Sequence, residues 1–205
     1  LFTLLVPIGD VAYRLNIFSG LLTASALVFT FYTLRNFGNS PFASLTASFV
    51  LGLGKNTIWS NAGTINVYAI SLLFISILLF IYSKWRKKQA IKFIYTYSFV
   101  WGLSLGTHVL LFVLGVPLLI MLWDFRKKII LELQILIKIV VLIIIPLAQY
   151  IYLYFAYKRN GIVTWGSMAS WHDFVHYITQ RDFSFKKWNR DLNASMPFIK
   201  KLRVL

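Results

Sequence analysis

Long apolar runs separated by short polar or basic breaks are the dominant pattern along this chain. A bilayer core is about 30 Å thick, so an α-helix needs roughly 20 apolar residues to cross it. Runs of about this length predict membrane-spanning helices at about 15–34, 42–60, 67–82 and 139–157. A cluster of turn-forming residues between Asn36 and Pro41 separates the first two runs, and an uncharged polar break at 61–66 precedes the third.

Two basic clusters bracket residues 93–123, a run of 31 residues without a charged side chain other than His108. The clusters are Lys84, Arg86, Lys87, Lys88 and Lys92 on one side and Arg126, Lys127 and Lys128 on the other. Short loops rich in Lys and Arg stay cytoplasmic, so the run must enter the membrane and return. Because two full crossings need about 40 residues, the length predicts a hairpin of two short helices. Its tip near Gly102–His108 would leave a recess below the outer membrane surface.

The remaining segments complete an all-α prediction. Residues 125–138 mix charged and apolar positions, which favours an interfacial helix on the cytoplasmic face, and Pro146 predicts a kink in the last span. The fold class is therefore a polytopic transmembrane helix bundle of about six spans over 1–157. Residues 158–205 are predicted to be external and partly helical, with a capping box at Ser170 and Asp173. Because the chain starts with Leu1 inside an apolar run, we interpret it as a fragment of a longer protein.

Composition supports a membrane protein and indicates how its net positive charge should be interpreted. The chain is 59% hydrophobic and carries a formal charge of +15. Its basic residues cluster between apolar runs, which favours topology and contact with anionic lipid headgroups over nucleic-acid binding. Without cysteine the chain has no disulfide and no thiolate-bound zinc. We expect an integral, multi-pass membrane protein, located in the cell (inner) membrane if the source is prokaryotic.

Six polar residues near the predicted outer side are candidates for substrate binding: Arg14, Asn16, Lys55, Asn66, Tyr68 and His108. His108 either donates a hydrogen bond to a phosphate or hydroxyl in the recess or packs against a neighbouring carbonyl. Arg14 lies four residues after Asp10, so it forms either a local ion pair or an anion site. Lys55 either neutralises a lipid phosphate or extends to the headgroups, and Tyr68 either lines the recess or belongs to an interfacial aromatic belt.

Metal and acid chemistry have little support in the sequence. His172 and His176 lie one helical turn apart, but zinc needs three or four ligands, so we predict no metal site. Residues 15–123 contain no Asp or Glu, which argues against a proton-coupled transporter. A glycosyl transferase needs a carboxylate as a general base, so its catalytic acid would have to lie upstream of Leu1.

Five motifs in order resemble one family of multi-pass proteins, recorded as a domain of unknown function and including the eukaryotic transmembrane protein O-mannosyltransferase. The motifs are Gly9-Asp10-Val11-Ala12-Tyr13-Arg14-Leu15-Asn16 with Ser19; Trp59-Ser60 with Asn66-Val67-Tyr68; Gly102-Leu103-Ser104-Leu105-Gly106-Thr107-His108 with Pro117; Tyr150 and Tyr152; and Thr164-Trp165-Gly166 with the helix through His176 to Phe183. The family usually has Glu in place of Asn66 and Asn in place of Thr107.

The resemblance implies a GT-C class glycosyltransferase that uses a sugar on a polyprenyl-phosphate carrier. It implies that Arg14, Asn16, Tyr68 and His108 face the site and that the acceptor is a protein hydroxyl. The expected partners are membrane lipids, the lipid-linked donor and a protein acceptor, with no nucleic acid. A divalent metal cofactor is left open. The alternatives are a membrane transporter or lipid flippase, and a non-catalytic membrane scaffold.

Overall fold

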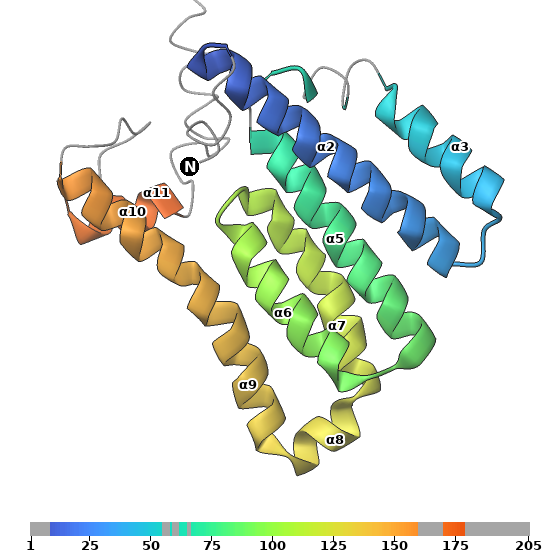
Figure 1. Ribbon diagram of the computed structural model, residues 1–205. Coiled ribbons are helices and arrows are strands. Elements are labelled where there is room, and N and C mark those ends of the chain that lie inside the picture. Colours follow the sequence, from blue (N-terminus) through green and yellow to red (C-terminus); the bar gives the residue numbers. More distant parts are fainter. Residues whose placement is uncertain (1–8, 55–57, 59–61, 65–66, 160–169, 179–205) are drawn as a thin grey trace, which may run out of the picture. The chain divides into compact units, whose positions relative to one another are not determined.

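The computed structural model describes residues 9–54, 58, 62–64, 67–159 and 170–178, and the regular elements within them are all helical. The chain divides into two compact units, residues 1–148 and 149–205. The first holds α2 (Val11–Asn36), α3 (Pro41–Gly52), α5 (Val67–Lys88), α6 (Ile91–Leu105), the 3-10 helix η2 (Val109–Leu114), α7 (Gly115–Asp124), α8 (Arg126–Leu131), α9 (Leu133–Ile144) and the 3-10 turn η3 (Ile145–Leu147) (Figure 1). The second holds α10 (Ala148–Lys158), apart from its first residue, and α11 (Trp171–Ile178).

Three helical runs are long and apolar enough to cross a membrane: Val11–Asn36, Val67–Lys88 and Leu133–Lys158. Their lengths of 26, 22 and 26 residues exceed the roughly 20 that a bilayer requires. The all-α prediction with membrane-spanning helices is therefore confirmed, and the chain is that of a membrane protein.

Local capping residues define where α2 ends and α3 begins. Gly38 adopts φ +94°, a left-handed conformation that glycine reaches without steric cost. The Arg35 side chain donates to the Asn39 carbonyl at 2.6 Å, and the Ser40 hydroxyl accepts the Ala43 N–H at 3.1 Å. Helix α3 ends at Gly52, after 12 residues, so it is shorter than the predicted 42–60 run. Glycines at 52 and 54 account for the early end because they disfavour helix continuation.

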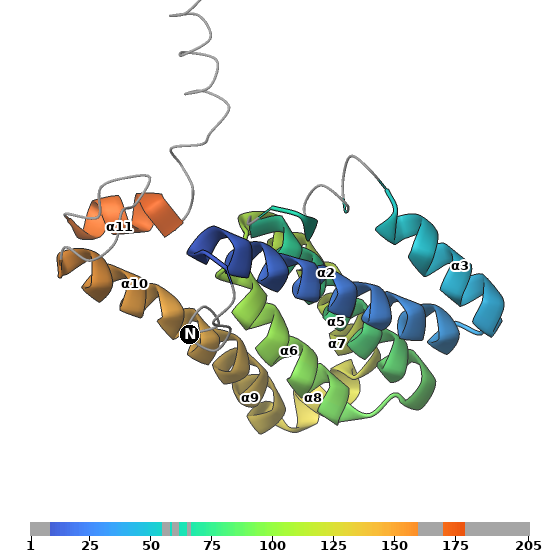
Figure 2. The same ribbon diagram turned by 45° about the horizontal axis from the view of Figure 1, so that its top comes forward.

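Helices α2 and α5 pack side by side and run parallel, as Figures 1 and 2 both show. Near their starts the Ser19 hydroxyl donates to the Thr64 carbonyl at 3.1 Å, and near their ends Asn36 Nδ2 donates to Ser83 Oγ at 2.9 Å. Two contacts in the same order on both helices fix a parallel arrangement. Arg35 and the Lys84 cluster therefore lie at the same end of the first unit, which is the arrangement that the topology prediction required.

The uncharged run between the basic clusters forms a helical hairpin, with α6 on one side and η2 followed by α7 on the other. Trp101 Nε1 donates to the Leu111 carbonyl at 3.0 Å, and the Tyr97 hydroxyl donates to the Leu114 carbonyl at 2.7 Å. At Gly115 an added Cβ would lie 2.8 Å from the Trp101 ring, so the glycine makes room for the indole. These contacts hold the two arms together along the half of the hairpin nearest its tip.

The buried apolar core of the first unit lies where α5, α6, α7 and α9 meet. Its members come from all four helices: Leu78, Ile81, Trp85, Ile94, Tyr97, Leu118, Met121, Ile135 and Ile139. Trp85 is fully buried, although the residues that follow it, Arg86, Lys87 and Lys88, are exposed. The apolar core thus extends to the basic end of the bundle.

The helix boundaries after the hairpin differ from the prediction of an interfacial helix over 125–138. Helix α8 ends at Leu131, and Glu132 leaves the helical region with φ −121° and ψ 80°. Lys138 therefore lies in α9, within the apolar run Leu133–Lys158. Pro146 lies in η3. Because proline has no N–H to donate, the α-helical pattern of backbone hydrogen bonds gives way there to 3-10 geometry.

The second unit contains the predicted helix start at Ser170. The Asp173 N–H donates to Ser170 Oγ at 3.1 Å, while the Ser170 N–H donates to Asp173 Oδ2 at 3.2 Å. This reciprocal pair is a capping box, so the prediction is confirmed for Trp171–Ile178. The buried Phe174 ring contacts Tyr154 of α10 at a centroid distance of 5.2 Å.

Candidate functional site

The first candidate residues lie at the start of α2, where the chain is shaped around Gly9. Gly9 has φ +71°, and a Cβ there would lie 2.5 Å from the Tyr13 ring. Asp10 is the N-cap, with its Oδ1 accepting the Tyr13 N–H at 2.7 Å. Arg14 donates through Nε and Nη2 to the Gly9 carbonyl at 3.2 and 2.9 Å. The motif thus places a guanidinium at a helix N-terminus, where the macrodipole adds to the positive potential.

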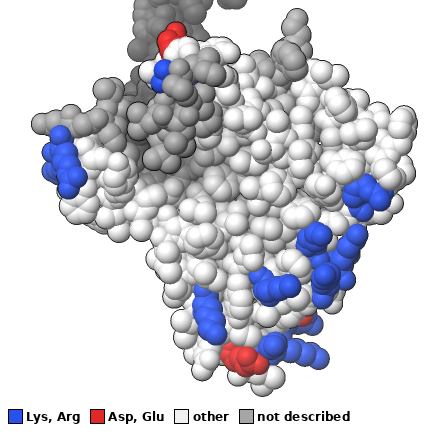
Figure 3. All heavy atoms as spheres, viewed as in Figure 1, with Lys and Arg blue, Asp and Glu red and all other residues white. Residues whose placement is uncertain are grey.

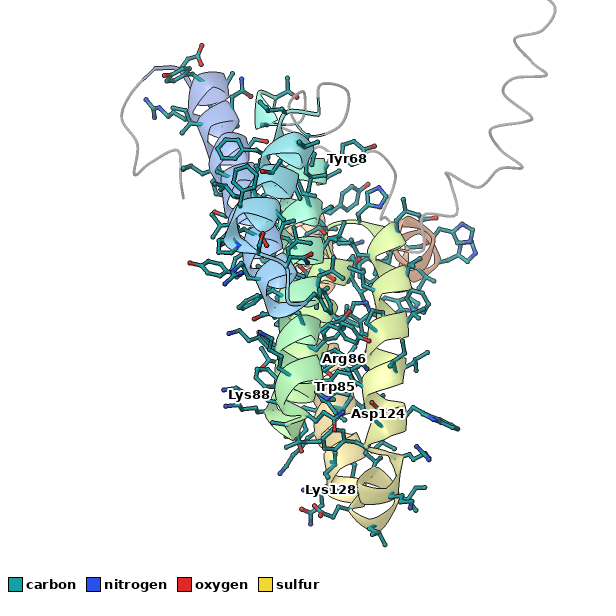
Figure 4. All side chains as sticks on the ribbon, turned by 90° about the vertical axis from the view of Figure 1, so that its right-hand side faces the viewer. Tyr68, Trp85, Arg86, Lys88, Asp124 and Lys128 are labelled. Atoms are coloured by element: carbon teal, nitrogen blue, oxygen red, sulfur yellow. The ribbon has the colours of Figure 1, made fainter. Side chains whose placement is uncertain are left out.

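The hydrogen bond between Ser19 and Thr64 brings the start of α2 next to the start of α5. Asn16 lies one turn before Ser19 and is half-buried, whereas Tyr68, in the first turn of α5, is 56% exposed. Arg14, Asn16 and Tyr68 therefore lie at the same end of the first unit. Figure 4 shows Tyr68 at the end of α5 opposite Trp85, Arg86 and Lys88.

His108 closes the hairpin tip and is placed against Tyr68, with ring centroids 6.0 Å apart. It is the N-cap of η2, and its Nδ1 accepts the Leu110 N–H at 3.2 Å. A ring nitrogen that accepts a hydrogen bond carries no proton, so the ring N–H is at Nε2. The backbone partner of the ring is thus the Leu110 N–H, not a carbonyl. This bond leaves Nε2 as the donor atom.

Sequence reasoning missed the residues that position this tip. The Thr107 hydroxyl donates to the Ser104 carbonyl at 2.7 Å, and Gly106 is the C-cap of α6. At Gly102 an added Cβ would lie 2.5 Å from the Ile143 carbonyl oxygen, so α6 and α9 approach closely one turn before the tip. Ser19, Thr107 and Gly102 all fall inside the motifs noted above, which is the signal that could have identified them.

Two candidates, Lys55 and Asn66, lie outside the described residues. Among the candidate residues described at this end, the donors are the Arg14 guanidinium, the Asn16 amide, the Tyr68 phenol and the His108 Nε2–H. The carboxylate nearest to them in sequence, Asp10, serves as a helix cap. Such a donor set suits an anionic oxygen ligand such as a phosphate.

Charge is distributed unevenly between the two ends of the first unit. Lys and Arg side chains gather around the end of α5 and around α8 in Figure 3, and Arg86, Lys88 and Lys128 lie at that end in Figure 4. The candidate site is at the opposite end. If the basic end is cytoplasmic, the site faces the external side.

The two other histidines of interest lie in the second unit. The His172 and His176 rings have centroids 4.2 Å apart, on one face of α11. Within the described part of the chain, no group of three His, Cys, Asp or Glu side chains is arranged to hold a metal ion.

Comparisons with known proteins support the family resemblance. Residues 1–132 match the family model described as protein O-mannosyl-transferase TMEM260 N-terminal domain. The chain is 26% identical over 201 residues to protein O-mannosyl-transferase TMEM260 of Mus musculus, a match that covers 94% of this chain and 28% of the mouse protein. The chain thus spans little more than a quarter of that relative's length. No solved structure matches it. Because the family model covers 132 of its 205 residues, the chain belongs to the family of TMEM260-type protein O-mannosyl-transferase N-terminal domains.

Proposed function

We propose that this protein is a membrane glycosyltransferase that transfers a sugar from a polyprenyl-phosphate carrier to a hydroxyl of a protein acceptor. Family membership supports the transferase class, and the relative is named as a protein O-mannosyl-transferase. The observation that carries the proposal in this chain is the pairing of Tyr68 with His108 at the end of the bundle opposite the basic residues. We infer a multi-pass topology with this site on the external side.

In the proposed reaction the acceptor oxygen attacks the anomeric carbon while the bond from that carbon to the phosphate oxygen breaks. The bonding electron pair leaves with the polyprenyl phosphate, and the acceptor proton goes to a carboxylate. We propose that this base is an Asp upstream of Leu1, as the family resemblance implies; residues 11–123 contain no Asp or Glu.

Within this mechanism, Arg14 and His108 stabilise the negative charge that develops on the leaving phosphate. A guanidinium matches phosphate geometry, and an imidazole Nε2–H donates without adding charge. Donors fixed before the reaction stabilise the transition state without paying for reorganisation, and removal of one such donor lowers kcat by about 10²–10³-fold. The Leu110 N–H fixes the imidazole in this way by holding Nδ1. We expect Lys55, Asn66 and Asn16 to contribute to donor binding.

The test is sugar transfer by the full-length protein from a polyprenyl-phosphate donor. His108→Ala is expected to reduce kcat by about 10²-fold, because it removes a donor to the leaving group. His172→Ala is the matched control, since it removes a histidine on α11 in the second unit. Equal rates for wild type and His108→Ala would remove His108 from the site.

A second substitution distinguishes the role of His108 as a hydrogen-bond donor from its role as the N-cap of η2. Asparagine is a good N-cap, so His108→Asn preserves an acceptor for the Leu110 N–H but cannot place a donor where Nε2 lies. We expect His108→Asn to match wild type in thermal stability and His108→Ala in kcat. Wild-type kcat in His108→Asn would show that the residue acts only as a cap.

A further inference from the structure

The end of the first unit opposite the candidate site carries an exposed basic surface. We define this basic surface as the end of α5 from Lys84 to Lys88, Lys92 on α6, and Arg126–Lys128 on α8. It contains eight Lys or Arg residues against two nearby acids, Asp124 and Glu132. All eight are exposed except Lys84, which is half-buried. Figure 3 shows these cations spread over one end of the unit, and Figure 4 places Arg86, Lys88, Asp124 and Lys128 there together.

The Trp123 ring and the Arg126 guanidinium lie in contact at the edge of this basic surface. Trp123 at the end of α7 is 67% exposed, and the Arg126 guanidinium lies 4.7 Å from the centroid of its ring. Arg126 also donates through Nη1 to the Trp123 carbonyl at 2.9 Å. The cation is therefore held in one place above an indole, an arrangement that membrane–water interfaces favour because the ring is amphipathic.

Exposed apolar side chains adjoin the same cations. Ile130 is 79% exposed and Leu131 is 84% exposed, in the same helix α8 as Lys127 and Lys128. In contact with a nucleic acid these side chains would stay in water. At a lipid surface these apolar side chains enter the acyl boundary while the cations face the phosphates. A bilayer therefore matches both the apolar and the basic side chains of the surface.

We propose that the basic surface binds anionic phospholipids of the bilayer leaflet, with Arg126 and Lys127 on headgroup phosphates and Ile130 and Leu131 in the acyl boundary. This binding is independent of sugar transfer, since it uses the other end of the first unit. Its role is to select the lipids around the hairpin and to hold α8 at the interface.

The experiment compares two double variants of the full-length protein. Arg126→Gln/Lys127→Gln removes two charges from the basic surface. The matched control, Lys158→Gln/Arg159→Gln, removes two charges from the end of α10, where Lys158 likewise lies over an aromatic ring, 5.5 Å from the Tyr154 centroid. Each protein is reconstituted in an equal mixture of phosphatidylglycerol and phosphatidylcholine and extracted in mild detergent. Native mass spectrometry then gives the ratio of the two retained lipids.

Wild type and control should both retain phosphatidylglycerol in preference to phosphatidylcholine. The surface variant should lose roughly tenfold to thirtyfold of that preference, because each basic residue near an anionic surface contributes about fivefold. Extraction of wild-type protein at 1 M salt, where the Debye length is about 3 Å, should also remove most of the preference, so the proposal does not depend on the variant folding.

Several outcomes would overturn the proposal. One is the absence of a phosphatidylglycerol preference in the wild type, and another is an equal loss in the control variant. A third is binding of an RNA oligonucleotide that is lost only in the surface variant, with lipid retention unchanged. Sugar transfer by the surface variant is expected to equal that of wild type, so failure of this proposal and failure of the proposed function are distinguishable.

Discussion

Replacing Gly102 with alanine should weaken the packing of α6 against α9. A Cβ at this position would lie 2.5 Å from the Ile143 carbonyl oxygen and 3.1 Å from the Ile143 Cα. Non-bonded heavy atoms are most favourable at about 3.5–4.0 Å, so the helices must separate by roughly 1 Å. Both contacting atoms belong to the backbone, so no side-chain rotation can relieve the overlap.

The expected cost follows from two opposing terms. Overpacking a close contact costs about 1–3 kcal/mol, whereas alanine is favoured over glycine inside a helix by up to about 1 kcal/mol. Gly20→Ala in α2 gains the same helix preference, but its Cβ would lie 3.7 Å from the Ala62 carbonyl oxygen, an ordinary contact. The difference between the two variants therefore isolates the packing term of about 1–3 kcal/mol.

The assay is thermal unfolding of the full-length protein in one detergent, followed by far-UV circular dichroism. All variants are scanned at one rate, because membrane proteins of this kind commonly unfold irreversibly. Gly52→Ala should fall between the other two, since its Cβ would overlap the Leu27 Cδ1 at 2.6 Å, which is a flexible side-chain end. A Tm for Gly102→Ala equal to or above that of Gly20→Ala would refute the reasoning.

Three further predictions concern individual hydrogen bonds and the reciprocal pair at Ser170. Tyr97→Phe removes the bond to the Leu114 carbonyl and should destabilise the protein by about 0.5–1.5 kcal/mol in a detergent-titration unfolding curve, whereas Tyr95→Phe on the same helix should change it less. Ser83→Ala removes the Asn36 partner and should destabilise the protein by about 0.5–1.5 kcal/mol, seen as a lower Tm; no change would mean that the α2–α5 contact does not need this bond. Hydrogen bonds from the Ser170 side chain and backbone lower the pKa of Asp173, so the capping box contributes stability above the unfolded pKa near 3.8 and loses it as pH falls below that value. Amide exchange of residues 171–178, corrected for intrinsic rates, should show this loss between pH 6 and pH 3 in wild type and not in Asp173→Asn.

Features that depend on neighbours in sequence could be predicted. The capping box at Ser170, the turn after Asn36 and the position of Pro146 all follow from residues within about four positions. The helical hairpin between the two basic clusters also followed from length and charge. The ends of α3 and α8 were harder to predict, since several apolar residues follow the last residue of each helix. There the hydrophobic pattern overestimates helix length because it does not register Gly52 or the break at Glu132.

The candidate site was only partly accessible to sequence reasoning. His108 was singled out because ionisable residues at membrane depth are costly, and Tyr68 because it lies at the start of a predicted span, but no pattern placed their rings 6.0 Å apart. The role of the Gly9–Arg14 motif also differs in detail from a simple ion pair. Asp10 caps α2 and Arg14 binds the Gly9 carbonyl, contacts that require the left-handed turn at Gly9.

The sequence by itself determined that this chain is helical, membrane-embedded and basic at one end, because apolar run length and the positions of Lys and Arg are one-dimensional properties. Only the tertiary structure decided which helix faces meet. Helices that are apolar on every side carry little information about their packing face, so the pairs Ser19–Thr64, Asn36–Ser83 and Gly102–Ile143 emerge only when the helices are in contact. The candidate site depends on the same contacts, since its residues come from α2, α5 and the hairpin tip.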